Sequence, residues 1–182
     1  SNSDLIAITV DSVVTKNFNT EERNEYEKGR KIYCYEGVGC VATWGARDRN
    51  RIGMFLREQN MTPQTHTVYD LADLVNKFLT QEYIPHDSNI GDIGYHVAGF
   101  DPEGHPKVFH IFWGTNRPPV LGETPDYHYQ KDLSGPGLLL YNGRNDLAST
   151  VIYSLVQEYR AGKDTNYDLS DPISLIEFGD LV

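Results

Sequence analysis

The sequence predicts an α+β domain in which antiparallel strands form the sheets and helices come in consecutive pairs. Short apolar runs occur as neighbours joined by turn residues, a pattern typical of antiparallel hairpins. Two helical apolar patterns follow each other in the middle of the chain, and two more lie near its C-terminal end. This order differs from the alternating strand and helix of a parallel sheet, so a Rossmann-type fold is not expected.

The first segments favour strands. Residues 5–15 are rich in β-branched side chains and predict a strand interrupted by an Asp-Ser pair. Residues 16–29 are polar and charged with little apolar periodicity, and they predict an exposed loop. Residues 31–36 and 40–44 alternate and flank the tight turn Gly-Val-Gly, so they predict two paired strands.

Helical spacing follows in the next part of the chain. Ile52, Phe55 and Leu56 predict a first helix. Thr67 and Asp70 resemble a capping box that begins a second helix. The apolar stripe of this second helix consists of Val68, Leu71, Ala72, Val75, Phe78 and Leu79.

The remaining segments complete the order. Residues 93–100 and 107–112 flank the turn sequence DPEGHP and predict a hairpin. Residues 114–137 show no period, and no order is assigned to them. Helical patterns over 145–160 and 170–182 predict two further helices, the latter with Ser-Asp-Pro at its start.

Composition limits the class of protein. At 182 residues the chain is long enough for one substantial core, so residues 1–182 are expected to form a single domain. A net charge of -10 disfavours a nucleic-acid partner and an anionic membrane surface, since both require clustered Lys and Arg. The longest apolar run is too short to span a bilayer, and no basic-then-apolar signal pattern begins the chain, so a soluble protein is expected.

The two cysteines, Cys34 and Cys40, lie in separate strand-like segments and do not have a ligand spacing such as C-x2-C. A disulfide framework is typical of smaller chains with more cysteines, so two free, buried thiols are expected. Free thiols favour a cytoplasmic location.

Four segments in collinear order resemble the proteasome β-subunit and HslV family of Ntn hydrolases. They are ITVDSVVT, RKIYCYEGVGCVATWGARD, GYHVAGFDPEGHPKVFHI and YDLSDPISLIEFGDLV. The resemblance implies a four-layer αββα sandwich of two antiparallel sheets, hydrolysis of a peptide or small amide, assembly as a homo-oligomer, and no cofactor. A non-catalytic scaffold of the same fold, similar to proteasome α subunits, is the alternative. An unrelated α+β binding protein is a third possibility.

In active members of this family an N-terminal threonine is the nucleophile, and its own α-amino group is the base. Carried over by position, Asp11 stands at the family's Asp, and either Arg30 or Lys31 stands at its Lys. Trp44 and Gly45 stand at the turn whose backbone N–H groups stabilise the oxyanion. Without the family resemblance, Asp11 is explained equally well as the end of a strand, where its side chain hydrogen-bonds to the local backbone. Lys31 is explained equally well as a charged residue on the surface.

The nucleophile is where the match departs from the family, because only SNSD precedes the strand at residue 5. Ser1 as nucleophile would lack the strand that positions it. The chain is therefore expected to be trimmed at both ends relative to the family, although Ser1 and Asn2 also fit a cloning remnant. Among the histidines, His96 and His110 are expected to share one sheet face and His105 to lie in the turn, an arrangement that does not favour a metal site.

Overall fold

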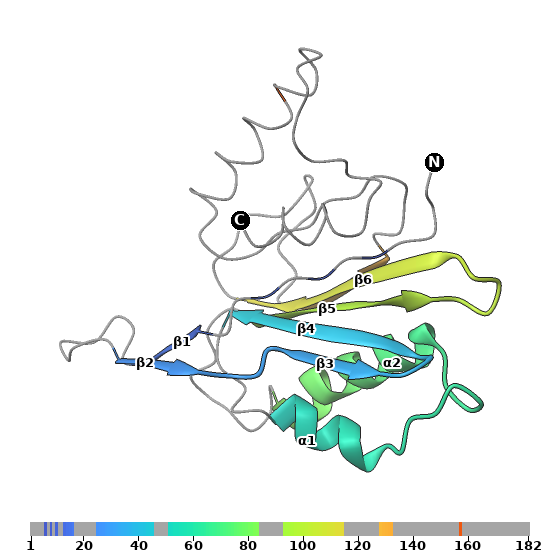
Figure 1. Ribbon diagram of the computed structural model, residues 1–182. Helices are drawn as coiled ribbons and strands as arrows, with labels where there is room; N and C mark the ends of the chain where they lie inside the picture. The colour runs from blue at the N-terminus through green and yellow to red at the C-terminus, as the bar shows by residue number, and fades with distance from the viewer. Residues whose placement is uncertain are drawn as a thin grey trace. The chain divides into compact units, whose positions relative to one another are not determined.

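The protein is described from a computed structural model, which describes residues 6, 8, 10, 13–16, 25–45, 51–83, 93–114, 128–132 and 157 (Figure 1). The chain divides into two compact units, one made of Ser1–Thr9 with Gly135–Val182 and the other of Val10–Ser134. Nearly all described residues belong to the second unit, and the architecture below is that of this unit alone.

Among the described residues of the second unit, seven strands form two antiparallel sheets. The two-stranded sheet pairs β1 (Val13–Lys16) with β2 (Glu25–Lys28). The five-stranded sheet has its strands in chain order, each antiparallel to the next. Its strands are β3 (Ile32–Tyr35), β4 (Gly39–Gly45), β5 (Ile93–Phe100), β6 (Pro106–Trp113) and β7 (His128–Asp132).

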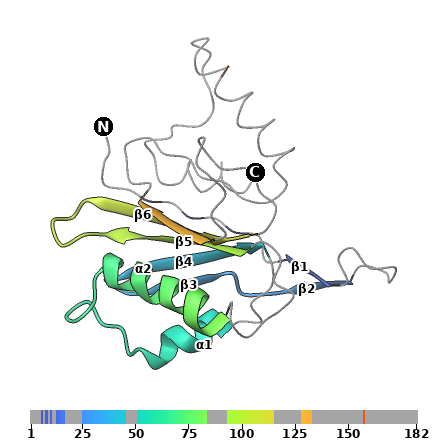
Figure 2. The same cartoon turned by 180° about the vertical axis from the view of Figure 1, so that it is seen from behind.

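Two helices cover one face of the five-stranded sheet (Figure 2). Helix α1 (Arg51–Glu58) follows β4, and helix α2 (Val68–Lys77) runs on into a π-helical turn, η1 (Phe78–Tyr83). Helix α2 packs against β5 and β6 as well as against α1. No helix in the described part of the chain combines the length and the apolar character needed to cross a bilayer.

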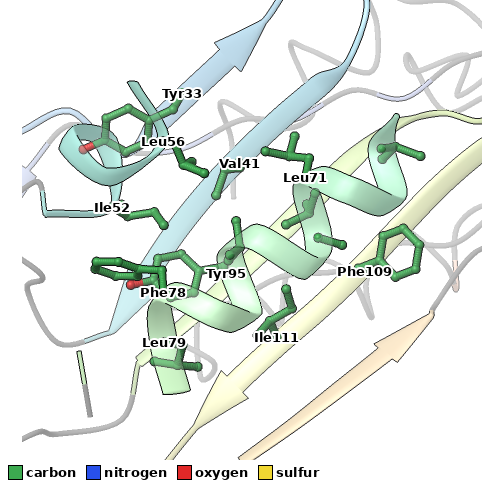
Figure 3. Packing of buried hydrophobic residues seen from close by; sticks show 14 of the residues in the cluster. Tyr33, Val41, Ile52, Leu56, Leu71, Phe78, Leu79, Tyr95, Phe109 and Ile111 are labelled. Atoms are coloured by element: carbon green, nitrogen blue, oxygen red, sulfur yellow. The ribbon is translucent and has the colours of Figure 1, made fainter. Parts of the chain in front are cut away.

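The hydrophobic core lies between these helices and the sheet (Figure 3). Strand residues Val41, Tyr95 and Ile111 are fully buried against the helical side chains. The helical side of the core contains Ile52, Leu56, Val68, Leu71, Ala72, Val75, Phe78 and Leu79, all buried. The predicted apolar stripe of the second helix is therefore confirmed, and that of the first helix is confirmed for Ile52 and Leu56, whereas Phe55 is only partly buried.

The central part of the opposite face of the sheet, here called the second face, is also withdrawn from solvent. Period-two alternation along the strands places Ala42, Ala98, His110 and Phe112 on this face, and all four are buried. Burial on both faces explains why β5 carries a nearly continuous apolar sequence instead of a strict polar–apolar alternation.

Several sequence predictions for individual elements are confirmed. The predicted first helix is α1, the predicted second helix is α2 continued by η1, and the capping box of α2 is formed by Thr67 and Asp70. The strand pair around Gly-Val-Gly is β3 and β4, and the hairpin over 93–112 is β5 and β6. These elements depend on local turn chemistry and on periodicity, which sequence reports directly.

Other element predictions need correction. The expected loop over 16–29 contains β2, whose sequence EYEK has no apolar alternation, so its strand character follows from backbone pairing with β1. Of the strand expected over 5–15, the described residues Val13–Thr15 belong to β1, and the described residues 6, 8 and 10 lie outside any strand. The unassigned stretch 114–137 contributes β7.

The C-terminal predictions lie largely outside the described residues. Of the helix expected over 145–160, only Gln157 is described, and it is helical. The helix expected over 170–182 lies entirely outside the described part. The single-domain expectation and the four-layer sandwich remain predictions.

Candidate active site at the open end of the β3–β4 hairpin

The structure brings the predicted basic residues and the predicted oxyanion turn to the same end of one hairpin. Arg30 and Lys31 immediately precede β3, and Trp44 and Gly45 are the last residues of β4. The backbone N–H of Thr43 donates a hydrogen bond to the carbonyl oxygen of Lys31 at 2.9 Å, which continues the β3–β4 register beyond the strand. Lys31 is thus the register partner of Thr43, the residue that precedes Trp44 in β4. Asp11 lies outside the described residues.

Gly45 ends β4 in a conformation that favours glycine. Its φ is 83°, in the left-handed region where a Cβ is disfavoured. The residue is exposed, so its backbone is accessible to a bound molecule. Backbone N–H groups at such a turn are suitable donors to a developing oxyanion.

The two basic residues have different surroundings. The guanidinium of Arg30 lies over the Tyr33 ring, 5.0 Å from its centroid, and its Nε donates to the carbonyl oxygen of Ile32 at 2.9 Å. The Tyr33 hydroxyl donates to the carbonyl oxygen of Arg30 at 3.3 Å. Arg30 therefore contributes to local packing around Tyr33. Lys31 is partly exposed, and its backbone anchors the hairpin.

The side chain of Trp44 belongs to an aromatic cluster on the second face, here called the Trp44 cluster: Trp44, His96, His110 and Phe112. Trp44 stacks on Phe112 with centroids 5.5 Å apart and an interplanar angle of 14°, and its ring centroid is 5.7 Å from that of His110. The rings of His96 and His110 are 4.7 Å apart. The indole thus has a packing role, and the exposed backbone at this end of β4 is that of Gly45.

The histidines are arranged as the strand pattern predicts. His96 and His110 are register partners across β5 and β6 on the second face, whereas His105 lies in the connecting turn. Burial lowers the pKa of His96 to about 4, so its imidazole is neutral at pH 7. A neutral, half-buried imidazole suits a packed aromatic cluster.

A second group of polar side chains, at the β5–β6 turn, was missed by sequence reasoning. The Asp101 carboxylate accepts hydrogen bonds from the backbone N–H groups of Glu103 at 3.1 Å and His105 at 2.8 Å. Its other oxygen lies 3.4 Å from Nδ1 of His105 and 4.0 Å from Nζ of Lys107. An Asp followed by Pro-x-Gly is the signal for this turn.

The electrostatics of this turn favour an ionised carboxylate. Burial acts to raise the pKa of Asp101, but the backbone N–H of His105, the charge of His105 and the N–H of Glu103 together lower it. One ligand atom from each of Asp101, Glu103 and His105 lies within 4.8 Å of the others. The hydrogen bonds account for this closeness as turn geometry, since Glu103 and His105 are exposed.

The cysteine prediction is wrong. Cys34 and Cys40 are not free thiols but form a disulfide, and their Cα atoms are 4.1 Å apart. The turn between β3 and β4 makes them direct register partners. Their equal distance of three residues from Gly37 was the signal that could have predicted the pair, because residues directly opposite in a hairpin are close neighbours.

Comparison of the chain with protein-family models, curated proteins and solved structures finds no match. The functional assignment therefore depends on the geometry at the open end of the β3–β4 hairpin and on the order of the sequence segments.

Proposed function

We propose that this protein is an amide hydrolase of the N-terminal-nucleophile type, which cleaves a peptide or small amide in its complete form and assembles as a homo-oligomer. The observation that supports the proposal is the backbone pairing of Lys31 with Thr43, two residues before the exposed Gly45. Acyl transfer from an amide requires a positive charge near the reacting groups and backbone N–H donors to the oxyanion.

In this reaction the nucleophile's hydroxyl attacks the amide carbonyl carbon, and an amino group accepts the hydroxyl proton. The amide C–N bond then breaks, the amine leaves with that proton, and water hydrolyses the acyl-enzyme and restores the hydroxyl. Lys31 would assist by favouring the deprotonated state of neighbouring groups through its positive charge. The backbone at Trp44 and Gly45 would donate hydrogen bonds to the oxyanion. Asp11 would stabilise the charge on the lysine, as the resemblance to the family implies.

The proposed architecture is the four-layer sandwich, in which the second face of the five-stranded sheet packs against another sheet. Support comes from burial: Ala42, Ala98 and Phe112 on that face are buried, as are the residues under the helices. A sheet buried on both faces is expected where layers lie on each side of it.

The test combines mass spectrometry with an activity assay on the protein as produced in cells. Intact-mass analysis and N-terminal sequencing should reveal a mature chain that begins with Thr, Ser or Cys, and a peptide electrophile should modify that residue. Hydrolysis of a fluorogenic peptide-amide panel should fall about a hundredfold or more in Lys31→Ala, because proton-transfer assistance contributes that much. Lys77→Ala, an exposed lysine at the end of α2, is the matched control.

Two outcomes would reject the enzyme. Equal activity in Lys31→Ala and Lys77→Ala would remove Lys31 from the mechanism. A mature terminus without Thr, Ser or Cys, together with no covalent adduct, would leave the non-catalytic scaffold of the same fold. One observation favours that alternative: the side chains of Arg30 and Trp44 serve packing.

A further inference from the structure

The disulfide between Cys34 and Cys40 lies at an accessible place. Strand β3 is at the edge of the five-stranded sheet among the described strands. Cys34 on this strand is exposed, and Cys40 on β4 is partly exposed. A reductant in solution can therefore reach the bond from the β3 side.

The hairpin tip is held in place by contacts other than the disulfide. The N–H of Val38 donates to the carbonyl oxygen of Tyr35 at 3.0 Å, and the Val38 side chain is buried. Gly37 packs closely on Pro63, since a Cβ at residue 37 would lie 2.8 Å from the Pro63 Cβ. Gly39 is equally close to β5, where an added Cβ would lie 2.6 Å from the carbonyl oxygen of Ala98.

The disulfide encloses a short loop, with a sequence separation of 6 residues. The entropy that a cross-link removes from the unfolded chain grows with loop length, so a short loop contributes at the low end. A disulfide that contributes little to stability and lies on an accessible sheet edge is suited to repeated reduction and oxidation.

We propose that Cys34 and Cys40 form a reversible redox couple whose co-substrate is a dithiol. The proposal is independent of amide hydrolysis. A thiolate of the dithiol attacks Sγ of Cys34, the S–S bond breaks, and Cys40 leaves as a thiolate that takes up a proton. The second thiol of the reductant then attacks the mixed disulfide and releases Cys34 as a thiol. The dithiol is oxidised to its disulfide, and the protein gains two thiols.

Exposure determines the order of attack. Thiol–disulfide exchange depends on which sulfur the incoming thiolate can approach, and Cys34 is the more exposed partner. The mixed disulfide is therefore assigned to Cys34, and Cys40 is the leaving and later the resolving thiol.

The test is alkylation of the folded protein with iodoacetamide, followed by intact-mass analysis. After treatment with oxidised glutathione, no cysteine should be labelled. After dithiothreitol without denaturant, both should be labelled, and the far-UV circular dichroism should not change. A second oxidation should restore protection. Failure of the bond to form, a need for denaturant before reduction, or loss of folded structure on reduction would each overturn the proposal.

Single variants test the order of attack. With oxidised glutathione, Cys34 in Cys40→Ser should form its mixed disulfide about tenfold faster than Cys40 in Cys34→Ser, because access governs the rate. Equal rates, or the reverse order, would overturn the assignment of Cys34. The double variant Cys34→Ser/Cys40→Ser is the control, and it should unfold cooperatively without labelling.

Discussion

Trp44 and Gly94 are register partners on β4 and β5, and the indole of Trp44 occupies the space that a side chain at residue 94 would need. The same indole stacks on Phe112 of β6, so one aromatic ring spans three neighbouring strands. The absence of a side chain at Gly94 is what allows this arrangement. The end of β4 that carries Gly45 is thereby fixed to the centre of the sheet.

Gly94→Ala is expected to destabilise the protein by about 1–3 kcal/mol, because the added methyl group overlaps the Trp44 indole and overpacks the second face. The free energy of unfolding in urea measures this. The control is the same substitution in a Trp44→Leu background, where the indole is absent and the cost should be smaller. An equal cost in both backgrounds would mean that the indole is not responsible.

Gly53→Ala on α1 is expected to be destabilising despite the helix propensity of alanine. Alanine gains about 1 kcal/mol over glycine inside a helix, but a Cβ at residue 53 overlaps the ring of Tyr33. Overpacking costs about 1–3 kcal/mol and should outweigh the gain. Met54→Ala, at the exposed neighbouring position, should change stability by less than about 0.5 kcal/mol. A more stable Gly53→Ala variant would contradict this packing.

Thr67→Ala is expected to cost about 1 kcal/mol of stability through loss of the α2 cap. The Thr67 hydroxyl accepts from the N–H of Asp70 at 3.4 Å, and the N–H of Thr67 donates to the Asp70 carboxylate at 2.7 Å. Urea unfolding measures the change. Gln64→Ala is the comparison, since Gln64 is exposed and lies before the helix. Similar costs for both substitutions would argue against a specific role of the cap.

The same cap predicts a pH effect. The hydrogen bond from the Thr67 side chain, followed by that from the Thr67 backbone, lowers the pKa of Asp70 below 3.8. A lowered carboxyl pKa contributes stability above the unfolded value, and this is lost as pH falls through the folded value. Thr67→Val should raise the Asp70 pKa toward 3.8 in an NMR titration. An unchanged pKa would exclude the hydroxyl as the main cause.

His96 predicts a second pH effect, of a different kind. Burial lowers its pKa from 6.5 to about 4, so the unfolded chain binds a proton between these values and the folded chain does not. The contribution of the neutral His96 to the free energy of unfolding should therefore be fully present above pH 6.5 and should be lost as pH decreases toward 4. At about 1.36 kcal/mol per pKa unit, the loss is at most about 3 kcal/mol.

His96→Gln should reduce the fall in unfolding free energy between pH 6.5 and pH 4.5, measured by urea unfolding at each pH. The amide does not titrate, so the variant lacks the proton uptake that destabilises the wild-type protein. An identical pH dependence in both proteins would assign the effect to other groups.

The candidate site was predictable only in part. Proximity of residue 31 to Trp44 follows from the β3–β4 hairpin, and the alternating segments around Gly-Val-Gly predict that hairpin. The separate roles of Arg30 and Lys31 were not predictable, because they depend on where the Tyr33 ring lies. The packing role of Trp44 likewise depends on Gly94 and Phe112, which lie far away in the sequence.

The sequence by itself determined the elements whose stability is local: the capped helix α2, the apolar stripe of α1, and the two hairpins β3–β4 and β5–β6. Caps, turns and periodicity act within a few residues, so they can be recognised without a fold. Only the tertiary structure decided that β2 and β7 are strands, that Cys34 is bonded to Cys40, and that burial lowers the pKa of His96. Each of these depends on a partner supplied by chain pairing or packing, and polar or aperiodic segments do not specify such partners.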